Sequence, residues 1–387
     1  MYRGSYLSNL VSNIESNINI DSNNVVFVNN HDGILLSKNQ VEDMLENKDQ
    51  LHVLTHIFHK DKMQTAYEPF MEWIRELYIE YFKNEISEEE FIDKCNVYKN
   101  HEEVFITYLK DGVCTRKEDV IISEIEYEKN KILMSLVNIF NVISSKKNLI
   151  IVLNNVQCAC GSTIKLLVKL LSSDECTGIG IIAIYNKNVN IEDYIKKDWN
   201  ELEEYINENR LNVDLGDFSN VNKYETSKNF VPKAEETQEY IEKIRNMCFL
   251  LAVEQAEEYM DVVYQRVERE KFNINATQKF NLVALYTLIN IYQKDARNAL
   301  MMCKILQSDT ENTNLSNQFV YYYLMAMAQE ELIQIESATE TARKCIEIAH
   351  ELDNKYLKFK ADILYVMVRT YGWAKVDIEY KKEHDIK

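Results

Sequence analysis

Residues 148–186 decide the fold, and they read NLIIVLNNVQCACGSTIKLLVKLLSSDECTGIGIIAIYN. Residues 149–153 form an uninterrupted apolar run rich in β-branched side chains, which is typical of a strand covered on both faces. Apolar residues then recur at helical spacing in residues 164–171, and residues 179–185 return to an apolar run. This order predicts a β-α-β unit of a parallel sheet, and in such sheets ligands bind where the strands end.

The composition indicates a large, regular and acidic chain. Its 387 residues are 46% hydrophobic, which allows two or three domains with sizeable cores. Only 8 Gly and 2 Pro favour long helices over loop-rich or disordered structure. Because 44 basic residues face 62 acidic ones, a formal charge of −18, we expect no direct nucleic-acid partner and no anionic membrane surface.

The sequence also predicts a cytoplasmic protein. No segment approaches the roughly 18 to 20 apolar residues that cross a bilayer, and the first residues lack the apolar core of a signal peptide. The bias towards Asn, Ile and Lys indicates an AT-rich bacterial genome. We expect reduced thiols, because the cysteines have no framework of spacings; they are at 95, 114, 158, 160, 176, 248, 303 and 345.

Periodicity predicts further elements before and after the opening unit. We expect strands at residues 25–28 and 51–58, and helices at residues 5–20, 38–45, 67–82, 117–144 and 191–209. Ser87, followed by three glutamates, resembles a capping box that opens one more helix. The polar stretch at residues 214–235 is the best candidate for a domain boundary.

Beyond residue 236 every long segment has a helical pattern, with alanines at close-packing positions. Residues 280–292 pair with 295–306, residues 319–332 pair with 338–352, and residues 356–371 begin another unit. Ala299 and Ala338 are 39 residues apart, slightly more than the roughly 34 residues of a TPR. The pattern predicts stacked helical hairpins, each of which buries its small-residue face on the next.

The loop after the strand at 25–28 has the position of a Walker A motif but not its residues. That motif reads GxxxxGK[ST], because glycines let backbone N–H groups approach phosphate while Lys reaches the β- and γ-oxygens. Here Leu35 stands for the Lys and Leu36 for the Ser or Thr, and both motif glycines are absent. A shifted frame that uses Gly33 and Lys38 does not restore the motif, and an ordinary strand-turn-helix explains the residues as well. The vestigial nucleotide-binding set is Asn29, Asn30, Gly33, Leu35, Leu36 and Lys38.

The strand at 149–153 ends in two neutral residues, Asn154 and Asn155. An ATPase carries acidic residues there, which hold Mg²⁺ and polarise water, whereas an amide brings neither charge nor a basic carboxylate. The two losses concern the two places where an ATPase needs its chemistry. Together they predict a fold that was kept while catalysis was lost.

The same residues resemble the Walker B region of bacterial STAND-type AAA ATPases, which is an apolar strand, two acids, then hQWAD and a Ser-rich helix start. Gln157, Ala159 and Ser162 fit this pattern, while Cys158 replaces the Trp. Residues 67–74, YEPFMEWI, resemble the YxPFxxWI segment of that family. The C-terminal hairpins resemble the TPR-like arrays that follow the ATPase in these regulators. The resemblance covers residues 20–372 and implies a signalling or transcription-regulating ATPase module.

Other candidate sites have simpler explanations. Cys158, Cys160 and Cys176 lack a fourth ligand at zinc-like spacing, so we expect free thiols. In a strand His52 and His56 would share a face, and with His59 they fit packing or surface roles rather than metal ligation. We assign no catalytic residue, no metal ligand and no firm cofactor, and ATP remains the one possible cofactor.

The sequence therefore predicts a helix at residues 1–19, a degenerate AAA-type P-loop α/β domain at 20–215, a linker at 216–235 and TPR-like repeats at 236–387. We expect a non-catalytic signalling scaffold, a pseudo-ATPase that binds a protein partner through the repeats and could form a homo-oligomer. The alternative is a nucleotide-sensing or weakly active ATPase switch that uses residues such as Lys38 or His31. A further alternative is the front part of a longer transcriptional or signalling regulator.

Overall fold

The computed structural model describes residues 2–17, 25–29, 35–116, 124–173, 177–186, 191–209, 212–214, 230–270, 272, 274–310 and 314–383. The chain divides into two compact units. The first, here called the sheet unit, comprises Met1–Thr115, Glu126–Val231 and Phe249–Gln255; the second, the helical unit, comprises the rest. Most of the expected 216–235 linker lies outside the described residues.

The sheet unit contains five parallel strands in the order β2-β3-β4-β1-β5. The strands are β1 (Val25–Asn29), β2 (Leu51–Ile57), β3 (Asn148–Asn154), β4 (Ile179–Tyr185) and β5 (Asn212–Asp214). Every residue of β4, and every residue of β3 after Asn148, is buried, as the continuous apolar runs predict. The parallel β-α-β unit at residues 148–186 is thus confirmed, with β3 and β4 paired directly.

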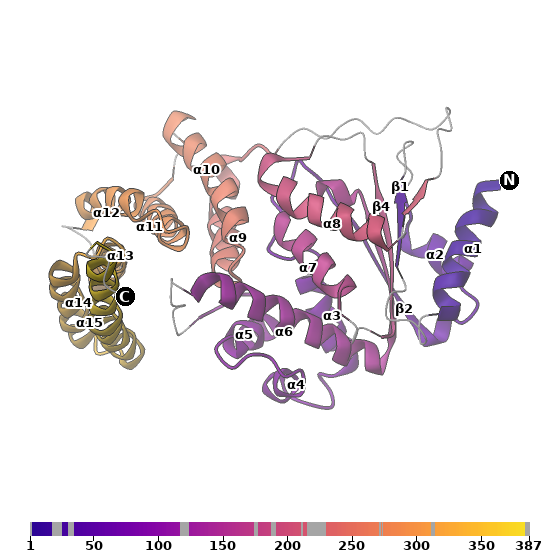
Figure 1. The fold of residues 1–387 in the computed structure, drawn as a ribbon, viewed down its shortest axis with the longest axis horizontal. Helices are drawn as coiled ribbons and strands as arrows, with labels where there is room; N and C mark the ends of the chain where they lie inside the picture. The colour runs from indigo at the N-terminus through magenta and orange to yellow at the C-terminus, as the bar shows by residue number, and fades with distance from the viewer. Residues whose placement is uncertain are drawn as a thin grey trace. The chain divides into compact units, whose positions relative to one another are not determined.

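Helices cover both faces of this sheet (Figure 1). The helices of the sheet unit are α1 (Tyr2–Asn17), α2 (Lys38–Met44), α3 (Phe70–Tyr81), α4 (Glu88–Lys94), α5 (Glu102–Asp111), α6 (Ile125–Lys146), α7 (Gly161–Leu171) and α8 (Lys196–Glu208), of which α4 and α5 lie farther from the sheet. The connection from β1 runs to the far edge at β2, and the later connections run back across the sheet. Because parallel crossovers are right-handed, α2 lies on the opposite face from α3, α6, α7 and α8. The helix α5 was not predicted.

A continuous core joins α1 and α2 to their face of the sheet. Val11 and Ile14 of α1 and Val41 of α2 pack in one buried cluster with Val152 and Ile182 of the central strands. The N-terminal helix therefore belongs to the sheet unit. On the other face, Ser87 forms the expected capping box with Glu90 at the start of α4.

The helical unit is built from helices joined by short turns. They are α9 (Thr237–Phe249), α10 (Val253–Glu270), α11 (Ala276–Tyr292), α12 (Ala296–Thr310), α13 (Leu315–Glu331), α14 (Ile335–Glu351) and α15 (Lys355–Glu383). Helix α11 packs on α12, and α13 on α14, which confirms the two expected hairpins. Within the described residues, no helix is long and apolar enough to cross a membrane.

The two hairpin turns close in the same way. Lys294 and Ile333 have positive φ angles of 62° and 60°. The next residue then donates its N–H to a carbonyl five positions back, from Asp295 to Asn290 over 2.8 Å and from Gln334 to Gln329 over 2.9 Å. This is the Schellman closure of a helix, and it gives both hairpins the same turn although neither turn contains glycine.

Candidate functional site

The carboxyl ends of the strands form the natural place for a site in this sheet. Strand β1 sends its connection towards β2, whereas its neighbour β4 sends its connection the other way, towards β5. A crevice opens in parallel sheets where the chain reverses direction like this, and ligands bind there. Asn29 ends β1, and Asn154 ends β3. The predicted site residues thus belong to this edge.

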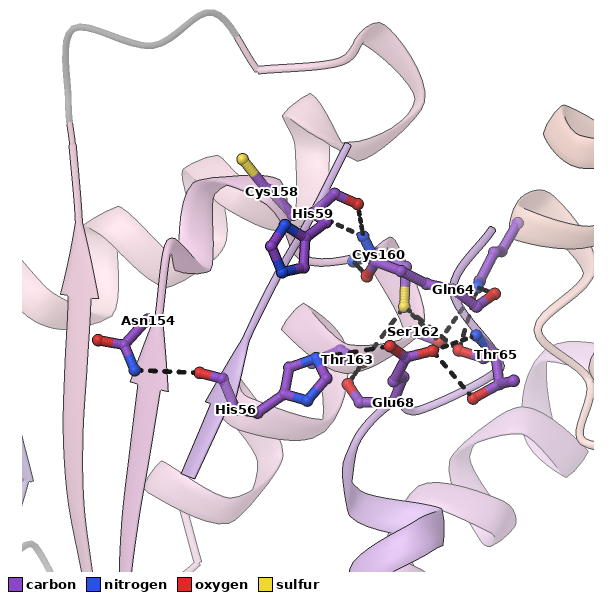
Figure 2. A network of polar contacts seen from close by, with 11 residues as sticks. His56, His59, Gln64, Thr65, Glu68, Asn154, Cys158, Cys160, Ser162 and Thr163 are labelled. Carbon is purple, nitrogen blue, oxygen red and sulfur yellow. Dashed lines mark hydrogen bonds and ion pairs between the residues drawn. The ribbon is translucent and has the colours of Figure 1, made fainter. Parts of the chain in front are cut away.

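Both the oxygen and the nitrogen of the Asn154 side-chain amide are hydrogen-bonded inside the protein. Its Oδ1 accepts the backbone N–H of Leu36 over 2.8 Å, and its Nδ2 donates to the Leu36 carbonyl over 3.0 Å. The same Nδ2 also donates to the carbonyl of His56 over 3.2 Å (Figure 2). Asn154 has no exposed surface. The amide therefore ties the β1–α2 loop to strands β2 and β3.

A carboxylate could not make these three contacts. An ionised Asp offers only acceptors, so it would place a carboxylate against the carbonyls of Leu36 and His56 in place of the Nδ2 donor. The loss of a buried hydrogen bond of this kind costs about 1–3 kcal/mol. A neutral amide at the end of β3 is thus the residue type that suits this packing.

The other predicted site residues that the structure describes lie in different environments and do not form one site. Leu36 is 3% exposed and packs in the core beside α2, so it presents no hydroxyl and no open surface. Asn155 follows β3 with a positive φ of 58°, which begins a short 3₁₀ turn. Lys38 is the first residue of α2, and its exposed ammonium lies 3.9 Å from Glu42. Leu35 is half-buried, while Asn30, His31, Gly33 and their loop neighbours lie outside the described residues.

A second group of polar side chains binds the β2–α3 loop to the β3–α7 loop, and we call it the loop network. Gln64 donates to the carbonyl of Cys158 over 2.7 Å and accepts the N–H of Cys160 over 2.9 Å. Thr163 donates to the carbonyl of Glu68 over 2.6 Å. The network consists of His56, Gln64, Thr65, Tyr67, Glu68, Cys160, Ser162, Thr163 and Gln255, most of which Figure 2 shows.

Glu68 is the charged member of the loop network. Its Oε2 accepts the N–H of Thr65 over 2.7 Å, and its Oε1 lies 3.4 Å from Nε2 of His56. Burial raises the pKa of Glu68, but the hydrogen bonds from His56 and Thr65 outweigh burial and hold the pKa below its ordinary value. Glu68 is therefore ionised and fully engaged, which suits a structural anchor better than a general acid.

The network also holds the segment Phe249–Gln255, which the sheet unit takes from between α9 and α10. Ser162 donates to Gln255 Oε1 over 2.7 Å and accepts the N–H of Tyr67 over 2.9 Å. Gln255 donates in turn to the Gln64 carbonyl over 3.0 Å. Leu251 within the segment has a positive φ of 54°. The segment is thus anchored by buried hydrogen bonds at its end.

The thiols of this region are not activated as nucleophiles. Burial raises the pKa of Cys158 to about 11 and also raises the pKa of the fully buried Cys160. A reactive cysteine needs a lowered pKa, because the thiolate is the nucleophile. The described cysteines are all free, and among the described residues no group of three His, Cys, Asp or Glu could hold a metal ion.

A small cavity adjoins the start of α7. Its lining carries charges of both signs, and Lys165 lies 3.7 Å from Asp198 and 3.8 Å from Glu254. Gly161 leaves room here for Asp198, since a Cβ at this position would lie 3.1 Å from a carboxylate oxygen of Asp198 and the carboxylate would have to shift. The space open to the centres of water molecules is about 30 Å³. Since about 10–15 Å³ of such space holds one water molecule, the cavity suits ordered water and not a nucleotide.

Sequence reasoning found part of this site. The two segments that carry the family resemblance do meet, through Tyr67 and Ser162, and Gln157 accepts the N–H of Asn186 at the end of β4. It missed Gln64 and Gln255, because a single glutamine in a loop, as Gln64 is, or in the first turn of a helix, as Gln255 is, has no local signature. Gln64 lies within residues 63–71, which are mostly apolar in sequence and mostly buried in the structure. A glutamine inside such a run is the one signal that could have identified it.

Comparisons of the chain with protein-family models, with curated proteins and with solved structures find no match.

Proposed function

We propose that this chain is a non-catalytic regulatory scaffold built on the AAA-type P-loop fold of STAND regulators. The strand order supports the fold, because β4 lies between β1 and β3. AAA-type ATPases likewise insert one strand between the strand that precedes the P-loop and the strand that ends in Walker B. The position of both resemblance segments at one sheet edge agrees with it.

The bonding of Asn154 carries the proposal that the ATPase is inactive. An ATPase keeps the side chain at this position open towards Mg²⁺ and water. Here that side chain is buried and bonded to the backbone of Leu36, the residue that stands for the magnesium-binding Ser or Thr. A Mg-ATP complex would have to displace three buried hydrogen bonds to reach it.

A scaffold needs a surface for its partner, and the helical unit is the better candidate. Stacked helical hairpins present extended surfaces that bind proteins. The formal charge of −18 disfavours nucleic acid and favours a protein partner. We propose that the partner binds the helical unit while the sheet unit supplies a rigid structural base.

Calorimetric titration of the purified chain with ATP, with and without Mg²⁺, tests the proposal. We expect no saturable binding up to millimolar ATP and no release of phosphate. Asn155→Ala serves as the matched variant, because it lies beside Asn154 without sharing its buried hydrogen bonds. Mg-dependent turnover that is lost in Asn155→Ala would overturn the proposal.

The second candidate, a nucleotide-sensing switch, rests on Lys38. Its ammonium is exposed at the first turn of α2, after β1, and only a long 3.9 Å contact to Glu42 engages it. Magnesium-dependent ATP binding that weakens at least tenfold in Lys38→Ala would favour this switch over the scaffold.

A further inference from the structure

Three helices of the helical unit begin with the same local pattern. Asn275, Asn314 and Asn354 each accept backbone N–H groups at the start of α11, α13 and α15. A phenylalanine follows five residues after each of these caps. The spacing between corresponding positions is 39 residues and then 40 residues. The three helices are therefore equivalent members of one repeat: Phe280, Phe319 and Phe359 correspond.

Burial separates the third helix from the other two. Phe280 and Phe319 are each 3% exposed, whereas Phe359 is 52% exposed. Seven residues further along, Thr287 and Ala326 are fully buried, whereas Val366 is 56% exposed. Ile363 lies between Phe359 and Val366 on the same helical face and is half-buried. We call Phe359, Ile363 and Val366 the open face of α15.

The helices that pack around the three equivalent members differ. Helix α12 covers α11, and α14 covers α13, while α15 packs on α14 and α13. The covering helices carry small residues that are fully buried, such as Ala299 in α12 and Ala338 and Ala342 in α14. Among the described residues, α13 packs against α11, α12, α14 and α15, whereas α15 packs against α13 and α14. The open face of α15 thus lies on a side of the helix that neither α13 nor α14 covers.

The charges around the open face indicate the kind of helix that would fit. Residues 355–370 carry four basic residues and one acidic residue, in a chain that is acidic as a whole. Helix α14, which covers the preceding unit, carries four glutamates and two basic residues. An acidic covering helix would therefore match α15 in charge as well as in shape.

We propose that the open face of α15 docks an acidic, amphipathic helix of a partner protein, with small residues four positions apart, which buries Phe359 and Val366 as their equivalents in α11 and α13 are buried. Small side chains let the two helices approach closely, as Ala338 and Ala342 do in α14. The inference rests on the partner-binding part of the proposed function and names its surface. It is independent of whether nucleotide binds the sheet unit.

A peptide with the sequence of α14, residues 335–351 with Cys345 replaced by Ser, serves as the probe. Fluorescence anisotropy of the labelled peptide would be measured against the full chain. We expect saturable binding that weakens at least tenfold in Val366→Asp. Met301→Asp is the matched control, since Met301 is equally exposed, at 56%, on α12. Binding to this control chain should equal binding to the unchanged chain.

A second peptide tests the small-residue requirement. Ala338→Leu and Ala342→Leu together place bulky side chains in the contact, so this peptide should bind at least tenfold more weakly. No binding of the first peptide at millimolar concentration, or equal binding to Val366→Asp, would overturn the proposal. A dimer that light scattering finds for the unchanged chain but not for Val366→Asp would also overturn it, because a second copy would then occupy the face.

The result also separates this proposal from the proposed function. Mg-dependent ATP turnover with intact, Val366-dependent peptide binding would refute the inactive scaffold but keep the docking face. Circular dichroism of Val366→Asp checks that the variant folds, which its exposed position predicts.

Discussion

The carboxyl edge of the sheet has its polar side chains hydrogen-bonded within the protein, whereas the open face of α15 exposes apolar side chains to solvent. At the sheet edge, the side-chain amides of Asn154 and Gln64 are hydrogen-bonded to the chain's own backbone. On α15, Phe359 and Val366 lie about half in solvent, although the equivalent residues of the two preceding repeats are buried.

The difference teaches where binding energy is available. A polar group that is already hydrogen-bonded gains little from a ligand, since the ligand must first replace an existing bond. An exposed apolar side chain gains about 25 cal/mol for each Å² that a partner removes from water. The end of β3 thus has little to offer a ligand, and the helical unit has more.

The largest expected effect is a difference between two equivalent phenylalanines. Phe319→Ala should lower the free energy of unfolding of the helical unit by about 3–5 kcal/mol, because it removes a buried ring and leaves a cavity. Phe359→Ala should change that free energy by less than about 0.5 kcal/mol, since the ring is half exposed. Hydrogen exchange followed by mass spectrometry measures both changes in α13 and α14.

Equal losses in the two variants would break this comparison. They would mean that Phe359 is covered in solution, either by another part of the chain or by a second copy. Repeating the exchange over a range of protein concentrations tells these two apart, because only self-association depends on concentration.

The next effect belongs to the sheet edge. Asn154→Asp should destabilise the sheet unit by about 2–4 kcal/mol, because a buried negative charge then faces the carbonyls of Leu36 and His56 in place of the Nδ2 donor. Asn155→Asp makes the same chemical change one residue later, outside these bonds, and should cost less than about 1 kcal/mol. Urea denaturation followed by tryptophan fluorescence reports mainly on this unit, which holds Trp73 and Trp199.

A stable Asn154→Asp variant that binds Mg-ATP would contradict the structural role of Asn154. It would show that the loop can leave the amide and open the position to metal. A variant that is less stable and still does not bind Mg-ATP is the outcome that the hydrogen bonds predict.

Local periodicity explains what the sequence could predict. Strands β3 and β4 and helix α7 were readable because apolar runs and helical spacing are properties of neighbouring residues. The same holds for the capping box at Ser87. The helical hairpins were readable from their alanines, although their turns place Lys294 and Ile333 at positive φ, where a sequence reader expects glycine.

The hydrogen bonds of the site residues could not be predicted from the sequence, because they join residues that lie far apart in the chain. Asn154 meets Leu36 across 118 residues, and Gln255 meets Gln64 across 191. From sequence, Asn154 was the loss of a carboxylate, and only the fold shows that the amide donates and accepts at the same time. Such pairings follow from strand order and loop packing, which no local pattern contains.

The smallest expected effect concerns the charge of Glu68 and its dependence on pH. Hydrogen bonds from His56 and Thr65 hold the pKa of Glu68 below its ordinary value in the folded chain. A depressed carboxyl pKa adds stability above the unfolded-state pKa, about 4.3, and this stability disappears as pH falls through the folded pKa. Each unit of depression corresponds to about 1.4 kcal/mol.

Glu68→Gln should therefore be less stable than the unchanged chain at pH 7, and the difference should shrink as the pH falls below about 4.3. Urea denaturation from pH 7 down to pH 3, followed by tryptophan fluorescence, measures this difference. Glu76→Gln is the matched control, because it removes one exposed carboxylate from α3, the helix that follows the loop of Glu68. A difference between Glu68→Gln and the unchanged chain that stays constant over the whole pH range would show that Glu68 contributes shape and not charge. The sheet edge would then be held by its neutral amides and hydroxyls alone, which would widen its contrast with the basic surroundings of α15.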